Sequence, residues 1–284
     1  MTKEKILNWE ITGAIIISLL GSLFHFMFAS FVSPVFANVP SMFPAPPDLS
    51  PLAAVEKLHK RIRSYPEMAN WQAAVLTTLR DMDKDWKPKK KTVVEKFVIV
   101  KDKVRIEKIL SATEYEGDRT KDLTAKYQAE AEKFNKKSES SQGEDGGRKG
   151  GRYRGLDLSR DEMFPFGEDR RADYEYELRE GTLAAGQRVH ILETLSLQKS
   201  SDIYEGKYFI HPETYDILRA ELRPAKNPGP LKLLEMHIDF DRLPEGYLVI
   251  KSTRIRIHVG LIVKNIRMES EERYSDFQVL DDPL

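Results

Sequence analysis

Apolar and polar residues alternate along the C-terminal third of the chain, and this is the period of strands that bury one face. The clearest run lies at 234–240, and its apolar members are Leu234, Met236, Ile238 and Phe240. Turns that contain proline, glycine or asparagine separate such runs at intervals of roughly ten residues. The pattern predicts an antiparallel β-meander over 203–278.

Two further pairs of strands are predicted upstream of this meander. Residues 92–100 and 103–110 form a hairpin, and 172–178 and 187–197 form two more strands. The strand 92–100 is apolar on both faces, because Val93, Phe97 and Ile99 alternate with Val94, Val98 and Val100. We expect such a strand where a sheet packs on a helix and a cavity at once.

Apolar residues at a spacing of three and four predict helices at 52–65, 70–82 and 121–137. Asp48 or Ser50 can cap the first helix, and Pro51 suits its first position. The second and third helices carry the apolar stripes Trp71, Val75, Leu79 and Met82, and Leu123, Tyr127, Ala131 and Phe134. A stripe of this kind is the usual buried face of a helix.

The first 37 residues contain an apolar run at 11–32 that follows Lys3 and Lys5 and precedes Ala37. These features fit an export signal that is cleaved after Ala37. The run is also long enough to span a bilayer as an uncleaved anchor with both lysines inside. Both interpretations place the rest of the chain outside the cytoplasm. The proline-rich segment 38–51 predicts an extended linker.

A long charged insert lies near 111–172. Its part at 138–154 is rich in glycine, serine and charge, which predicts a disordered or mobile loop. The run 146–155 resembles an RGG-type RNA-binding segment, but no stacking platform accompanies it. The apolar island Met-Phe-Pro-Phe at 163–166 is expected either to pin this loop to the body of the protein or to form an exposed plug.

Three segments of the meander carry a family resemblance. The first, at 204–215, is a strand followed by a His-Pro-Glu-Thr turn and the start of the next strand. The second is the Leu-Pro-Glu-Gly-Tyr turn at 243–247, and the third is Tyr-Ser-Asp-Phe at 274–277. Together they resemble the LolA-like outer-membrane lipoprotein-sorting proteins, the lipoprotein-localisation carriers. The resemblance implies an α+β fold, in which helices cover the apolar concave face of a curved antiparallel β-sheet, or incomplete β-barrel, that accepts acyl chains. The insert near 111–172 departs from the family, and no ligand-gating residue is carried over.

Charge and residue types argue against several classes of function. Basic and acidic residues balance at 45 each, so no global field points to nucleic acid. The chain has no cysteine, which excludes disulfides and thiolate catalysis. It contains neither a His-Glu-x-x-His nor a Gly-x-Ser-x-Gly motif. His237 and His258 could approach each other across a sheet, and His237 is the one candidate residue for a hydrolase. We therefore expect no enzyme, no metal and no cofactor.

The sequence predicts an exported binding protein, in the periplasm or cell envelope, whose β-domain at 52–284 holds a lipid, an acylated lipoprotein or a similar apolar ligand. The alternative is a membrane-anchored envelope interaction or sensor protein of the same fold, which binds a protein partner and associates with the inner membrane through 11–32. The candidate side chains of the cavity are Trp71, Val75, Phe97, Ile99, Met236, Ile238 and Phe240.

Overall fold

The computed structural model describes residues 49–101, 104–140, 164–201, 203–261 and 265–280. The predicted export or anchor segment at 11–32, the cleavage position at Ala37 and the glycine-rich run 146–155 lie outside these residues. Within the described ranges, no helix is long and apolar enough to cross a membrane.

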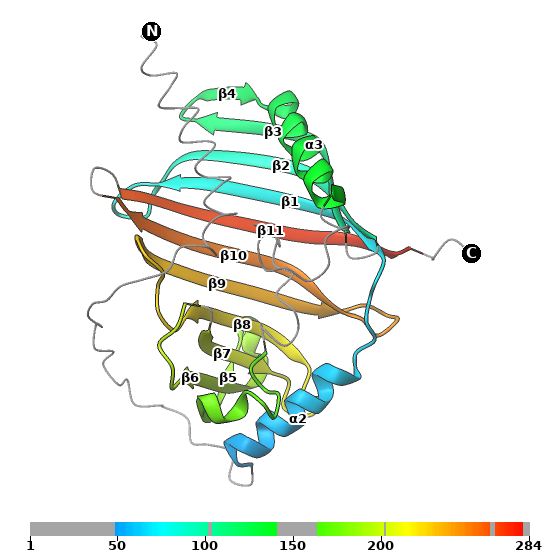
Figure 1. Cartoon of the computed structure of the whole chain (residues 1–284), viewed down its shortest axis with the longest axis vertical. Coiled ribbons are helices and arrows are strands. Elements are labelled where there is room, and N and C mark those ends of the chain that lie inside the picture. The colour runs from blue at the N-terminus through cyan, green and yellow to red at the C-terminus, as the bar shows by residue number, and fades with distance from the viewer. Residues whose placement is uncertain (1–48, 102–103, 141–163, 202, 262–264, 281–284) are drawn as a thin grey trace.

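A single antiparallel sheet of 11 strands organises the chain (Figure 1). The strand order is β4-β3-β2-β1-β11-β10-β9-β8-β7-β6-β5, so the sheet leaves sequence order only where β1 meets β11. The sheet is curved and does not close, because β4 and β5 are its two edges. The strands are β1 (Trp71–Met82), β2 (Pro88–Lys101), β3 (Val104–Glu116), β4 (Arg119–Asp122), β5 (Tyr174–Thr182), β6 (Arg188–Ser196), β7 (Tyr204–Ile210), β8 (Ile217–Pro224), β9 (Leu231–Arg242), β10 (Leu248–Gly260) and β11 (Asn265–Val279).

Two α-helices lie against this sheet, α2 (Pro51–Ser64) and α3 (Thr124–Ser140). The hydroxyl oxygen of Ser50 accepts a hydrogen bond from the backbone N–H of Ala53 at 3.2 Å and so caps α2. Asp122 binds the backbone N–H of Thr124 at 2.8 Å at the start of α3. Short 3₁₀ turns flank β5 as η2 (Arg171–Asp173) and η3 (Ala184–Gly186).

Both helices cover the same face of the sheet, which we call the inner face (Figure 1). Successive side chains of a strand point to opposite faces, and directly paired residues share a face. A row of such pairs runs across the sheet from β9, under α2, to β2, under α3, so the two helices lie on one face. Its members are Ile238, Thr253, Glu272, Thr77 and Val94. The opposite side of the sheet is called the outer face.

The hydrophobic core lies on the inner face in two parts. The larger part joins α2 to strands β5–β9, and it includes Val55, Leu58, Leu192, Tyr208 and Ile238, each fully buried. The smaller part packs Leu123, Tyr127 and Ala131 of the α3 region on Val94, Ile109 and Ala112. The predicted apolar face of the third helix is therefore confirmed for these three residues.

The predicted helix at 70–82 is wrong, because these residues form β1. Strand β1 pairs with β2 on one side and with β11 on the other along most of its length. Its inner-face residues include Trp71, Val75 and Leu79, which are spaced four apart. Residues four apart share a face of a strand as well as of a helix, so these three members of the stripe fit both periods, whereas Met82 fits only the helical one.

Most other expectations about secondary structure are confirmed where the structure describes the chain. The loop predicted at 138–154 is wrong at its start, because α3 continues to Ser140, and the rest of that loop and most of the linker at 38–51 lie outside the described residues. The structure contains the helices predicted at 52–65 and 121–137, the hairpin, the two strands before the meander and the meander itself. The second strand of the hairpin continues to Glu116, and the short edge strand β4, which the sequence pattern did not predict, follows it.

Candidate functional site

The inner face beneath α2 is filled by a short segment from outside the sheet. We call Phe164, Pro165 and Phe166 the aromatic tongue. Phe166 is 0% exposed and Phe164 is 6% exposed. This burial confirms that the apolar island packs on the body of the protein for its described residues, and Met163 lies outside them.

Ring contacts hold the tongue against the sheet. The Phe166 ring meets the Tyr208 ring edge-on at a centroid distance of 4.9 Å, and the Phe164 ring lies 5.9 Å from the Phe240 ring. Side chains also bind its backbone. The Tyr176 hydroxyl donates to the Pro165 carbonyl at 2.8 Å, and the Arg171 Nε donates to the Phe166 carbonyl at 2.8 Å. The tongue therefore fills the space between α2 and the inner face of strands β5–β9.

The seven candidate cavity residues divide between the two faces. Met236, Ile238 and Phe240 lie on the inner face, in the core that contains the tongue. Trp71 and Val75 also lie on the inner face, further along the sheet on β1.

Phe97 and Ile99 lie on the outer face. They alternate on β2 with Val94 and Val98, whose side chains are buried on the inner face. The structure therefore brings five of the seven residues to the inner face and separates these two from them.

The helix α2 is fixed to the turn between β7 and β8 by a polar latch around Asp216. Its carboxylate accepts bonds from Arg61 Nε at 2.6 Å, from the Tyr65 hydroxyl at 2.5 Å and from the Thr214 hydroxyl at 2.8 Å. Burial alone would raise the pKa of Asp216, but these three donors outweigh burial and lower it. The latch therefore holds α2 over the tongue and the core.

A group of paired charges lies on the inner face near α3, and we call it the inner charge cluster. Lys96 Nζ lies 3.0 Å from Glu107 and 3.3 Å from Glu272, and Arg105 lies 2.8 Å from Glu107. The Tyr274 hydroxyl donates to Glu272 at 2.7 Å. Two cations therefore face two carboxylates, and the cluster is neutral.

Both carboxylates of this cluster are held in the ionised state. Burial by itself would raise the pKa of Glu272, but Lys96 and Arg105, together with the Tyr274 hydroxyl, lower it to about 2. Burial by itself would also raise the pKa of Glu107, but Lys96 and Arg105 lower it. Sequence reasoning missed this cluster, although a lysine between Val94 and Val98 on one strand face was a visible signal.

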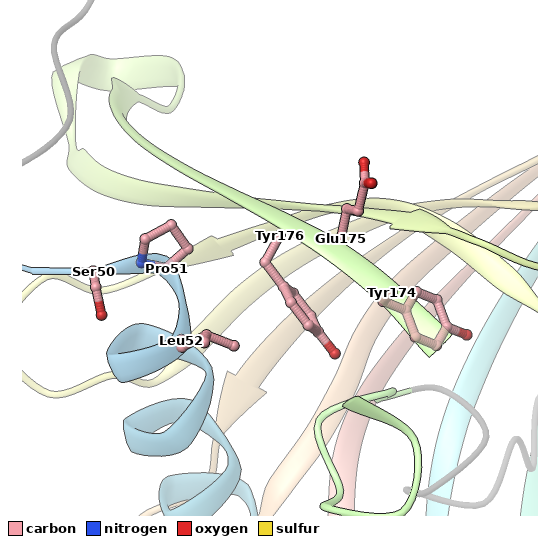
Figure 2. Close-up of a pocket in the computed structure, with 6 residues that line it drawn as sticks. All are labelled: Ser50, Pro51, Leu52, Tyr174, Glu175 and Tyr176. Atoms are coloured by element: carbon pink, nitrogen blue, oxygen red, sulfur yellow. The ribbon is translucent and has the colours of Figure 1, made fainter. Parts of the chain in front are cut away.

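A shallow, open depression of about 550 Å³ borders the edge strand β5 (Figure 2). Its walls are the start of α2 at Ser50, Pro51 and Leu52 and the strand residues Tyr174, Glu175 and Tyr176. The two tyrosines point to the side of α2, whereas Glu175 points away from it (Figure 2). The depression is too open to enclose an acyl chain.

The described residues hold no group of three or more His, Asp or Glu side chains that could bind a metal ion. His237 and His258, which we expected to be able to approach each other, are separated. His237 pairs with Arg254, and His258 pairs with Leu233. Each lies on the outer face, His237 beside Glu221 at 3.6 Å and His258 beside Asn265 at 3.4 Å.

Neither the protein-family models nor the curated proteins gave a match to this chain. Several solved structures are similar to it, among them the following three. A LolA superfamily protein from Nitrosomonas europaea is 15% identical with a TM-score of 0.35, over 83% of this chain and 96% of that one. A domain described as an outer membrane lipoprotein-sorting protein, from Vibrio parahaemolyticus, is 12% identical with a TM-score of 0.33, over 79% and 91%. A DUF1329 family protein from Desulfovibrio piger is 13% identical with a TM-score of 0.37, over 81% and 94%. The chain is thus similar in fold to LolA superfamily proteins.

Proposed function

We propose that the protein is an exported, non-enzymatic binding protein. It holds an apolar ligand, such as the acyl chain of a lipid or lipoprotein, between α2 and the inner face of the sheet. The aromatic tongue carries this proposal, because a segment that belongs to neither the sheet nor α2 supplies the apolar groups that fill this space. A ligand binds by taking the place of Phe164 and Phe166.

The exchange sets a minimum length for the ligand. Exposing both phenylalanine side chains costs about 3–6 kcal/mol, whereas each methylene buried in their place returns about 0.8 kcal/mol. Burying roughly eight methylenes only balances the upper value of the cost of exposing the two rings, whereas burying about sixteen clearly exceeds it. The site therefore selects long acyl chains over short ones.

The location follows from the N-terminal sequence. We propose that 1–37 is an export signal or an anchor, that 38–51 is a linker, and that the sheet and its helices act in the periplasm or cell envelope. The lysines before the apolar run at 11–32 support this orientation.

The test is binding of fluorescent fatty acids of increasing length to the full chain, purified from the envelope fraction. The informative variant replaces Phe164 and Phe166 by alanine. Its matched control is Phe97→Ala, which removes the same kind of ring from the outer face. We expect uptake of long chains by the unchanged protein, an affinity raised by about tenfold or more in the tongue variant, and no change in the control.

Two results would overturn the proposal. One is the absence of uptake by both the unchanged protein and the tongue variant, provided that circular dichroism shows both to be folded. The other is an equal effect of Phe97→Ala, because that result would place the ligand elsewhere than the inner face.

A second candidate function is a membrane-anchored interaction or sensor protein with a protein partner in the envelope. The observation in its favour is apolar surface on the outer face of β1–β3, where Leu76 is 37% exposed and Leu110 is 47% exposed. This function predicts an uncleaved N-terminus in the membrane fraction, and loss of a co-purifying protein when Leu76 and Leu110 become serine. A mature chain that begins near Asn38, with bound lipid and no protein, would decide against it.

A further inference from the structure

The two edges of the sheet are built differently. Strand β4 has four residues, all exposed, and it includes Arg119 and Lys121. Beyond β4, side chains of α3 cover the edge of β3. Asn135 binds both the N–H and the carbonyl of Glu107 at 2.9 Å, and Gln128 binds the Ile109 carbonyl at 3.3 Å. Short length, positive charge and covering side chains are the usual protections of an edge strand.

Strand β5 is longer than β4 and carries charges at Glu175, Glu177, Arg179 and Glu180, but in the part of the chain that the structure describes no side chain binds its backbone as α3 binds that of β3. It has nine residues, Tyr-Glu-Tyr-Glu-Leu-Arg-Glu-Gly-Thr, and contains neither proline nor lysine. A long edge strand whose backbone is left uncovered is a template for pairing with another strand, and its side chains select that strand.

The hydrogen bonds at its two ends fix which backbone groups of β5 bind to β6 and which face away from it. The Leu197 N–H donates to the Asp173 carbonyl at 2.9 Å, and the Leu183 N–H donates to the Gln187 carbonyl at 2.9 Å. In an antiparallel pair, hydrogen-bonded and non-bonded positions alternate. Odd-numbered residues of β5 thus bond to β6, and the backbone groups of Tyr176, Leu178 and Glu180 point outward.

The side chains of β5 complement a second copy of the same strand. If two copies pair antiparallel about Leu178, the outward residues bond to each other, and Glu177 of each copy lies directly opposite Arg179 of the other. Opposite charges in such pairs stabilise a sheet. Pairing about Glu177 would instead oppose two carboxylates, and pairing about Arg179 would oppose two guanidinium groups.

The state of Arg179 in the single chain supports this register. Its Nε is buried with no hydrogen-bond partner in the described structure, and its terminal nitrogen lies 3.6 Å from Glu193, which is longer than a hydrogen bond. The buried Nε is closed to a second copy, but the side chain is partly exposed and its terminal nitrogens can still donate to a carboxylate of that copy.

The depression beside β5 suits the same arrangement. Pairing about Leu178 places Glu180 and Thr182 of the second copy opposite Tyr176 and Tyr174, which border the depression (Figure 2). The first turn of α2, on the same border, has no acidic residue of its own. A helix N-terminus favours a nearby carboxylate, and Glu180 of the second copy provides one on that side.

We propose that two copies of this chain pair through β5, antiparallel about Leu178, so that their two sheets become one. This interaction surface is distinct from the ligand site beneath α2. The chain has no cysteine, so a single introduced cysteine reports on pairing without background.

The test co-expresses two full-length single-cysteine variants, Glu177→Cys and Arg179→Cys, under mild oxidation. In the proposed register these positions form a non-hydrogen-bonded pair with Cα atoms about 4.5 Å apart, within the range that a disulfide spans. We expect a disulfide-linked dimer in the mixture, several-fold more abundant than in either variant alone. Thr120→Cys on the opposite edge β4 is the control and should not cross-link.

Charge reversal gives a second measurement that leaves the backbone intact. Glu177→Arg and Arg179→Glu should each reduce the dimer fraction in light scattering, and the two together should restore it. A mixture that cross-links no more than its components or the Thr120→Cys control would overturn the proposal. So would a double reversal that stays as monomeric as the single ones.

Discussion

The inner charge cluster makes the stability of the fold depend on pH through Glu272. We consider Glu272→Gln, which keeps the shape of the side chain and removes its charge. In the folded protein the pKa of Glu272 is about 2, against an ordinary value of 4.5. The difference corresponds to about 3 kcal/mol of stability at neutral pH, because each pKa unit is worth about 1.4 kcal/mol.

The direction follows from the lowered pKa. A carboxyl group that binds its proton less tightly when folded stabilises the fold above its unfolded pKa, and this contribution is lost as the pH falls through the folded pKa. The destabilisation by Glu272→Gln should therefore be about 3 kcal/mol at pH 7 and shrink between about pH 4.5 and pH 2.

The assay is urea unfolding of both proteins, followed by circular dichroism at several pH values. Glu116→Gln, at the exposed end of β3, is the control and should change the free energy of unfolding by less than about 0.5 kcal/mol. A difference between Glu272→Gln and the unchanged protein that stays constant with pH would refute the reasoning. It would mean that the loss came from packing and not from the charge.

Two further changes test other parts of the fold. Asp216→Asn removes the charged acceptor of the α2 latch, so it should lower the free energy of unfolding by about 1–3 kcal/mol at pH 7. The loss should shrink as the pH falls through the lowered pKa of Asp216. Urea unfolding at pH 7 and at a pH below that pKa measures the difference. Gly206→Ala would bring a Cβ within 1.9 Å of the Glu221 carbonyl oxygen in the neighbouring strand. We expect a loss of about 3 kcal/mol or more, or insoluble protein, and an unchanged melting temperature would contradict that contact.

The sequence predicted the meander well because its strands have one buried face. Met236, Ile238 and Phe240 alternate with polar residues, and all three are buried on the inner face. The helix predicted at 70–82 was wrong because Trp71, Val75 and Leu79 fit the periods of both a helix and a strand, and because the segment contains helix-forming alanine and leucine. Pairing with β2 and β11 along both sides overrides that local preference.

The faces of β2 show a second limit. Alternation correctly separated Phe97 and Ile99 from Val94 and Val98, but it could not tell which set lay beneath a helix. Which set is covered depends on where α3, which follows β4 in the chain, packs on the sheet through Leu123 and Tyr127. The tongue was visible only as an apolar island, since its partners Tyr208 and Phe240 are distant in sequence.

The proposed binding of an acyl chain would be limited by the inner charge cluster. An acyl chain that extended from the tongue position towards β2 would reach Lys96 and Glu272. Separating these buried partners costs several kcal/mol, which is more than the burial of a few methylenes contributes to binding. An anionic head group gains nothing from Lys96 or Arg105, because Glu107 and Glu272 already neutralise them. Affinity should therefore follow the length of the tail and not the charge of the head. We expect a long-chain fatty acid and its methyl ester to bind within about threefold of each other, a difference below about 1 kcal/mol, in competition with a fluorescent fatty acid. A preference of about a hundredfold for the acid would show that a cation of the protein binds the carboxylate, and that the cluster opens when ligand enters.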